Sequence, residues 1–214
     1  MTAHEPTTLI IARHGEAHCN RDQIIGGPRG CRGLTDHGQT QVRRLAAMIH
    51  DQYLPPHAIY ASPLRRAAES ATILGTALGL PVTLEEDLRE QDHGDADGRT
   101  WAATVAAFGS APALEADRAL APGGETWRTY LLRASTVLTR ILDRHRGQRI
   151  LVVGHGETAD AAFHLFLHLP ATSRAQACLT LHPAAISVWE QTPLAWTRPG
   201  AGWRWTLVTH NPPT

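Results

Sequence analysis

The stretch Thr7–Glu16, TTLIIARHGE, is nearly repeated at Arg149–Glu157, RILVVGHGE. Each stretch contains an apolar run that is too short for a buried helix and is typical of a strand covered on both faces, as in a parallel sheet. Each run leads into a histidine followed by a glycine. Because parallel strands end at the same edge of a sheet, we expect His14 and His155 to lie together at the edge where open α/β folds bind ligands.

Strand and helix patterns alternate along most of the chain. Helices are predicted from about Thr35 to Asp51, Ser62 to Gly79, Gly123 to Gly147 and Thr158 to His168, with short strands over His57–Tyr60 and Pro81–Leu84. The tail is predicted to form a hairpin from Ala185–Glu190 and Trp203–His210. The fold class is therefore α/β, a three-layer sandwich in which helices flank a mostly parallel central sheet, with a C-terminal antiparallel edge hairpin. We expect residues 1–214 to form a single domain.

The composition limits the partners. The 20 basic residues balance 20 acidic ones, so binding to nucleic acid or to an anionic membrane is not expected. No stretch is apolar and long enough for a signal peptide or a membrane span. The chain has 3 cysteines, and because an odd number cannot all form disulfides within the chain, free thiols and a cytoplasmic location are expected. The terminal hairpin offers an edge that can pair between two copies, which makes a homodimer a hypothesis.

Arg65 is unusual for its position. It follows the predicted helix cap Ser62 by three residues, where a capping box would have glutamate, and it places a cation at the positive end of a helix. This choice becomes favourable if an anion binds there, because backbone N–H groups and the guanidinium would point at the same phosphate. The alternative is an ion pair with Glu69, one turn along the helix. The residues alone leave both interpretations open.

Six ordered blocks of sequence resemble the histidine phosphatase superfamily, and more narrowly its phosphoglycerate mutase-like branch. They are LIIARHGEAHCN from Leu9, GLTDHGQTQ from Gly33, SPLRRAAESA from Ser62, LREQDHGDADGRTW from Leu88, GGETW from Gly123 and VVGHGET from Val152. The resemblance follows the family's order over nearly the whole chain. It implies a phosphohistidine mechanism that requires neither a metal nor another cofactor.

The resemblance also implies a role for each matched residue. His14 matches the nucleophile, whose imidazole nitrogen attacks phosphorus to give a phosphohistidine that water later hydrolyses. Arg13, Arg65 and His155 match the groups that hold the phosphoryl oxygens and stabilise their charge. The full phosphate-binding set implied in this way comprises Arg13, His14, Asn20, Arg65, His155 and Gly156.

Glu90 matches the family's general acid. It would protonate the leaving oxygen and then, as a carboxylate, activate the attacking water, so its pKa should be raised. Asp92 is the alternative acid, and the acidic run Glu85–Asp97 taken alone would also fit a solvated surface cluster. Glu125 and Thr158 are weaker candidates for the pocket wall.

A metal site is not expected. His164 and His168 are four residues apart on a predicted helix, a spacing that can bind zinc. No glutamate follows His164, however, and a third ligand is not indicated. We interpret both residues as helix-surface or interface histidines.

The sequence therefore predicts a metal-independent phosphatase that hydrolyses a small phosphorylated metabolite. The alternatives are a phosphoglycerate-type mutase and a catalytically idle module that binds a phosphorylated ligand. The basic cap with which mutases of this family hold a carboxylated substrate has no counterpart between Trp101 and Gly124, which favours hydrolysis. The sequence does not decide whether the substrate contacts His18, Arg29, Arg32 and His93.

Overall fold

The computed structural model describes residues 5–53, 55–110, 115–195 and 202–212. Its centre is a six-stranded sheet in the order β3-β2-β4-β1-β5-β6. The strands are β1 (Thr8–Arg13), β2 (Ala58–Ala61), β3 (Val82–Leu84), β4 (Arg149–Gly154), β5 (Ile186–Pro193) and β6 (Trp203–His210). The first four run parallel, whereas β5 pairs antiparallel with β1 and β6 antiparallel with β5. The predicted parallel sheet with an antiparallel edge hairpin is confirmed.

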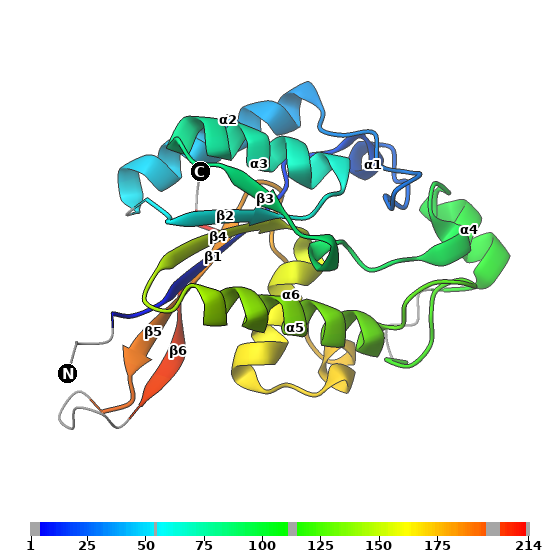
Figure 1. Ribbon diagram of the computed structural model, residues 1–214. Coiled ribbons are helices and arrows are strands. Elements are labelled where there is room, and N and C mark those ends of the chain that lie inside the picture. Colours follow the sequence, from blue (N-terminus) through cyan, green and yellow to red (C-terminus); the bar gives the residue numbers. More distant parts are fainter. Residues whose placement is uncertain (1–4, 54, 111–114, 196–201, 213–214) are drawn as a thin grey trace.

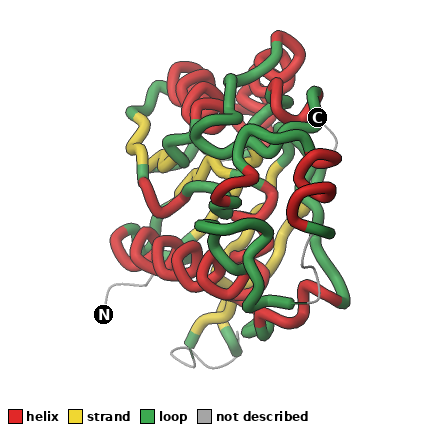
Figure 2. The backbone as a smooth tube through the Cα atoms, turned by 90° about the vertical axis from the view of Figure 1, so that its right-hand side faces the viewer, coloured by secondary structure: helices red, strands yellow, loops and turns green. Residues whose placement is uncertain are grey.

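Helices cover both faces of the sheet, which confirms the three layers (Figures 1 and 2). Helices α2 (Asp36–Gln52) and α3 (Arg65–Leu78) lie on one face, and α5 (Trp127–Arg144) and α6 (Gly156–Leu167) lie on the other. The shorter elements are α1 (His18–Arg21), α4 (Trp101–Phe108) and the 3₁₀ turns η1 (Glu86–Leu88), η2 (Gly94–Ala96) and η3 (Ala171–Ala175). Among the described residues, no helix has the length and apolar character needed to cross a bilayer.

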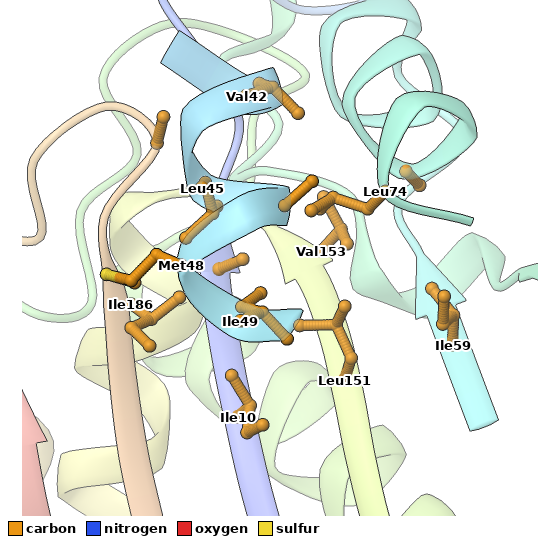
Figure 3. Close-up of a cluster of buried hydrophobic side chains, with 14 of the residues drawn as sticks. Ile10, Val42, Leu45, Met48, Ile49, Ile59, Leu74, Leu151, Val153 and Ile186 are labelled. Carbon is orange, nitrogen blue, oxygen red and sulfur yellow. The ribbon is translucent and has the colours of Figure 1, made fainter. Parts of the chain in front are cut away.

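The two apolar faces of β1 explain why the strand reads as a continuous hydrophobic run. Ile10 and Ala12 pack in the cluster beneath α2 and α3, whereas Leu9 and Ile11 pack in the cluster beneath α5 and α6. Figure 3 shows the first cluster, in which α2 side chains such as Ile49 lie over the strands. Each buried side chain of this kind contributes about 1.5–3 kcal/mol.

The register of the central strands brings the two histidine motifs together. Arg13 of β1 is paired with Gly154 of β4, so the residues after each strand leave the sheet at the same edge. The N-terminal turn of α2 lies against this edge, since a Cβ atom added to Gly15 would be 2.4 Å from the carbonyl oxygen of Gly38. Glycine at position 15 therefore allows the close contact that fixes the backbone after His14.

Candidate active site

The His14 ring is held in one tautomer. Its Nδ1 lies 2.7 Å from the carbonyl oxygen of Gly15, and its Nε2 lies 3.0 Å from Nε of Arg66. Because a carbonyl can only accept and a guanidinium can only donate, the ring proton is on Nδ1 and the lone pair is on Nε2. Nε2 is therefore the nitrogen able to act as a nucleophile. The His155 ring lies edge-on to His14, with 5.4 Å between the ring centroids, as predicted from the paired motifs.

Arg66 supplies a buried cation beside His14. Its side chain is only 4% exposed, and its Nη2 lies 3.9 Å from Oε2 of Glu90. A second guanidinium nitrogen, Nη1, donates to the carbonyl oxygen of Gly26, and the backbone N–H donates to Sγ of Cys31 at 3.4 Å. The contacts of the guanidinium nitrogens with His14, Gly26 and Glu90 hold this group in a fixed orientation, which favours recognition of an anion.

The structure places Arg65 outside this group and corrects the predicted phosphate contact. The Arg65 side chain is 67% exposed, and its Nε donates to Oε1 of Glu69 at 2.7 Å, which is the alternative pairing considered from the sequence. Helix α3 buries the face that carries Arg66, Ala67, Ser70, Ala71, Leu74 and Gly75. Arg65 lies on the opposite side with Glu69. The buried residues of α3 recur at helical spacing, and this spacing includes Arg66 and leaves out Arg65.

Ser62 contacts the second histidine instead of capping α3. Its Oγ lies 2.8 Å from Nε2 of His155, whereas the residue at the cap position is Leu64. Ser62 Oγ accepts from the backbone N–H of Leu64, which leaves the hydroxyl hydrogen available to His155 Nε2. A neutral His155 ring then carries its proton on Nδ1. Thr158, a weaker candidate from the sequence, accepts from the His155 backbone N–H at 3.0 Å and so fixes the start of α6.

Two buried donors at this edge have no hydrogen-bond partner among the described residues, namely Nε of Arg13 and Nδ1 of His155. Leaving a buried polar group unsatisfied costs about 1–3 kcal/mol, so such atoms require an explanation. Another nitrogen of Arg13, Nη1, donates to the carbonyl oxygen of Leu181 at 2.7 Å, which orients the guanidinium. Gly156 lines the same pocket as Arg13. An anionic ligand would satisfy both donors.

Glu90 joins the group from the loop that follows β3. Its Oε2 lies 3.6 Å from Nδ1 of His155. Arg133 of α5 secures this loop by donating to the carbonyl oxygens of Asp87 and Glu90 at 2.8 and 3.4 Å. Glu125 pairs with Arg133 at 2.6 Å, so Glu125 supports the loop that carries Glu90.

Three further candidates from the sequence, namely Asn20, Arg29 and His93, contact neighbouring parts of the fold. Asn20 accepts from the backbone N–H of Ala17 at 3.0 Å and thereby closes the first turn of α1; none of its hydrogen bonds to described residues reaches the histidine pair. Arg29 joins two loops by donating to the carbonyl oxygen of Gly94 at 2.8 Å. The His93 ring packs edge-on against Trp101.

No group of three or more His, Cys, Asp or Glu side chains in the described ranges could hold a metal ion. His164 packs edge-on against Trp127, with 5.5 Å between ring centroids. Its Nδ1 lies 3.2 Å from the carbonyl oxygen of Leu169. His164 is only 5% exposed and packs inside the fold, so the expectation of a helix-surface or interface histidine is wrong for this residue, whereas His168, which follows α6, is exposed.

Comparison with known proteins identifies the family. The family model of the histidine phosphatase superfamily (branch 1) matches residues 9–198. The chain belongs to the histidine phosphatase superfamily. Phosphoglycerate mutase-like protein 4 of Arabidopsis thaliana is 34% identical over 153 residues, which cover 69% of this chain and 66% of that protein. A metal-independent phosphoserine phosphatase of the same plant is 27% identical over 164 residues, covering 74% of this chain and 68% of that protein.

A solved structure extends the comparison to the fold. A mycobacterial glucosyl-3-phosphoglycerate phosphatase superposes with a TM-score of 0.79 at 25% identity, covering 97% of this chain and 99% of that one. Three mycobacterial relatives at 32% identity are longer, and the chain spans 41% of their length. Relatives in the superfamily thus include phosphatases and mutase-like proteins.

Burial and charge keep both histidines neutral. Burial, followed by the Arg66 charge, lowers the pKa of His14 well below its usual value, although the hydrogen bond to Gly15 acts in the opposite direction. Burial and the same cation also lower the pKa of His155. A neutral ring at neutral pH leaves the lone pair of His14 Nε2 available to act as a nucleophile.

The carboxyl group of Glu90 is shifted in the opposite direction. Burial, followed by the nearby charge of Glu157, raises the pKa of Glu90 well above its usual value, although the charges of Arg66 and Arg13 oppose this shift. A raised pKa was expected for the general acid. Glu157 itself was not among the candidates from the sequence.

The lowered histidine pKa values predict a loss of stability in acid. Below about pH 6.5 an unfolded chain binds protons at His14 that the folded chain does not, so the free energy of unfolding falls as the pH falls, by up to about 1.4 kcal/mol per pH unit. The raised pKa of Glu90 acts with the opposite sign in the same range. Urea unfolding of the wild type and His14→Asn between about pH 7 and pH 5 isolates the histidine, and the variant should show the smaller acid-dependent loss. His50→Asn, at an exposed position on α2, is the matched control. Equal losses in wild type and His14→Asn would contradict the assignment.

Proposed function

We propose that this chain is a phosphoric monoester hydrolase that transfers the phosphoryl group of a small metabolite first to His14 and then to water, without a metal ion. The observation that carries the proposal is the geometry around His14 Nε2. This atom has its lone pair directed at a buried guanidinium, while the neighbouring donors of Arg13 and His155 have no partner among the described residues. A phosphoryl group would bind at this position.

The first step forms the phosphohistidine. The phosphoryl oxygens replace His14 as the acceptor of the Arg66 Nε–H and also receive the donors of Arg13 and His155. His14 Nε2 then attacks phosphorus, the bond from phosphorus to the leaving oxygen breaks, and protonated Glu90 gives its proton to that oxygen. The fixed side chains hold the reactants in line for this displacement.

The second step returns the enzyme to its starting state. Glu90, now a carboxylate, removes a proton from a water molecule as the water attacks phosphorus. The nitrogen–phosphorus bond breaks, inorganic phosphate leaves, and His14 recovers its lone pair. Every proton and bond is thereby accounted for with side chains already present at the site.

Hydrolysis is favoured over mutase action by the segment that covers residues 101–124. Its single basic residue is Arg118, whose Nε donates to Oε1 of Glu115 at 3.0 Å. This segment therefore lacks the cluster of cations that would hold a carboxylated product for return of the phosphoryl group.

Phosphate release from a panel of phosphomonoesters, measured with a chelator present, tests this function. Glu90→Gln is expected to lower kcat by about 10²-fold or more on alkyl phosphates, because their alkoxide leaving group needs a proton. The loss in the first step should be much smaller with nitrophenyl phosphate, whose leaving group departs as an anion. Asp92→Asn, two residues along the same loop, is the control and should stay close to wild type.

Two results would contradict the proposal. Activity that the chelator abolishes would remove the metal-independent route. Absence of phosphate release from every compound, with folding confirmed by circular dichroism, would favour a mutase if added bisphosphoglycerate starts phosphoryl transfer, and a binding module if it does not.

A further inference from the structure

The carboxyl group of Glu90 is in contact with a second carboxyl group, that of Glu157. Gly156 opens α6, and Glu157 is the next residue, so its side chain lies at the same edge as the histidine pair. The two side chains are hydrogen-bonded to each other. Since a carboxylate can only accept a hydrogen bond, one of the two groups carries a proton.

The neighbouring charges determine which carboxyl holds that proton. Arg174 of η3 donates to Oε1 of Glu157 at 3.1 Å. Arg174 is itself fixed, because its guanidinium lies 4.0 Å from the ring centroid of Trp127. Although burial acts to raise the pKa of Glu157, the hydrogen bond from Glu90 and the charge of Arg174 outweigh burial and lower it. Glu157 is therefore the charged member of the pair, and Glu90 is the protonated one.

The full electrostatic surroundings agree with this division. The titratable or charged groups that act on Glu90, or on which Glu90 acts, are Arg13, Arg66, Tyr130, His155 and Glu157. Those that act on Glu157, or on which it acts, also include His93, Asp160 and Arg174. Arg66 and Arg13 favour ionised Glu90, so burial and Glu157 are the two influences that keep its proton in place.

We propose that Glu157 is a positioning residue that holds the catalytic proton on Glu90 before the substrate binds and draws a proton back to Glu90 from water in the second step. The proposal rests on the phosphatase function proposed above. After Glu90 has protonated the leaving oxygen, two carboxylates face each other at hydrogen-bond distance. Their mutual repulsion favours removal of a proton from the attacking water, and the shared proton is then restored.

The test uses Glu157→Gln, which keeps the size of the side chain and removes its charge. The basic limb of the kcat/KM pH profile reports loss of the acid's proton in the free enzyme. In Glu157→Gln this limb should move to lower pH, because the amide can donate to an ionised Glu90. Glu69→Gln is the matched control, since it is the same substitution at a carboxylate that pairs with the exposed Arg65 and lies outside the group around Glu157. Its basic limb should stay close to that of the wild type.

A second variant shifts the profile in the opposite direction. Arg174→Gln removes the cation that keeps Glu157 charged, so the last proton of the pair is held more strongly and the basic limb should move to higher pH. A residue that only shapes the pocket would change kcat or KM and leave the limb in place. An unmoved limb in both variants would overturn the proposal.

The titration of the carboxyl groups can be followed without any activity. In protein labelled with ¹³C at the glutamate carboxyl carbons, the Glu90 signal is identified by its loss in Glu90→Gln. This signal should titrate at lower pH in Glu157→Gln than in the wild type, and an unchanged titration would overturn the pair. If the wild type releases no phosphate, the proposed function fails, while this titration still decides whether the pair shares a proton.

Discussion

Replacing His14 with alanine is expected to lower the rate of phosphate release by at least about 10⁴-fold, because the covalent route loses its nucleophile. The structure gives this residue a neutral ring, a proton fixed on Nδ1 by Gly15, and a lone pair on Nε2. The remaining cations would still bind phosphate, so binding of inorganic phosphate, measured by calorimetry, should persist. The matched control is His164→Ala, because His164 is also buried but packs against Trp127, whereas His14 packs against His155.

Activity that survives in His14→Ala would change the mechanism. A loss of tenfold or less would indicate direct attack by water or a different nucleophile. Unfolding in urea distinguishes this outcome from damage to the fold, since a folded and inactive variant is the expected state. His164→Ala should lose stability while keeping most of its activity per folded molecule.

Arg66→Ala is expected to have the second largest effect, a fall in kcat/KM of about 10²–10³-fold. The reason is the loss of a buried, oriented cation that contacts His14 and lies near Glu90. Arg65→Ala should stay within about twofold of the wild type, because Arg65 is exposed and pairs with Glu69 on the surface. These adjacent residues therefore form a matched pair with opposite expected outcomes.

Steady-state kinetics on one phosphomonoester decides between the two arginines. Arg66→Lys adds a control for charge, because lysine keeps the cation but cannot reproduce the planar fork of donors, so only partial recovery is expected. Severe loss in Arg65→Ala together with mild loss in Arg66→Ala would refute the placement of helix α3 relative to the site.

The main features of the fold could be predicted because they depend on local patterns. The two apolar runs before His14 and His155 are continuous because both faces of the sheet are covered, and their parallel pairing places the histidines together. The resemblance to the family identifies Glu90, which lies 3.9 Å or less from Arg66 and His155.

Two parts of the site were harder to predict. One requires knowing which face of α3 is buried, and the other requires a contact between segments that are far apart in the sequence. The sequence predicts Ser62 as the cap of α3 and Arg65 as the phosphate contact, whereas the cap is Leu64 and the arginine on the buried face is Arg66. The period of the small and apolar residues in α3 contained the information needed to correct this. By contrast, the contact between Glu90 and Glu157 joins a loop after β3 to the start of α6, and no local pattern reports how close those segments lie.

Trapping the phosphoenzyme tests the central claim most directly. Glu90→Gln is mixed with nitrophenyl phosphate, quenched in alkali and digested for mass spectrometry, because this variant can form the intermediate without an acid but lacks the base that hydrolyses it. We expect one alkali-stable, acid-labile phosphoryl group on His14, attached at Nε2, and none in the variant that also carries His14→Ala. A phosphoryl group on any other residue, or a reaction that releases nitrophenol with no trapped phosphoenzyme, would contradict the phosphohistidine mechanism.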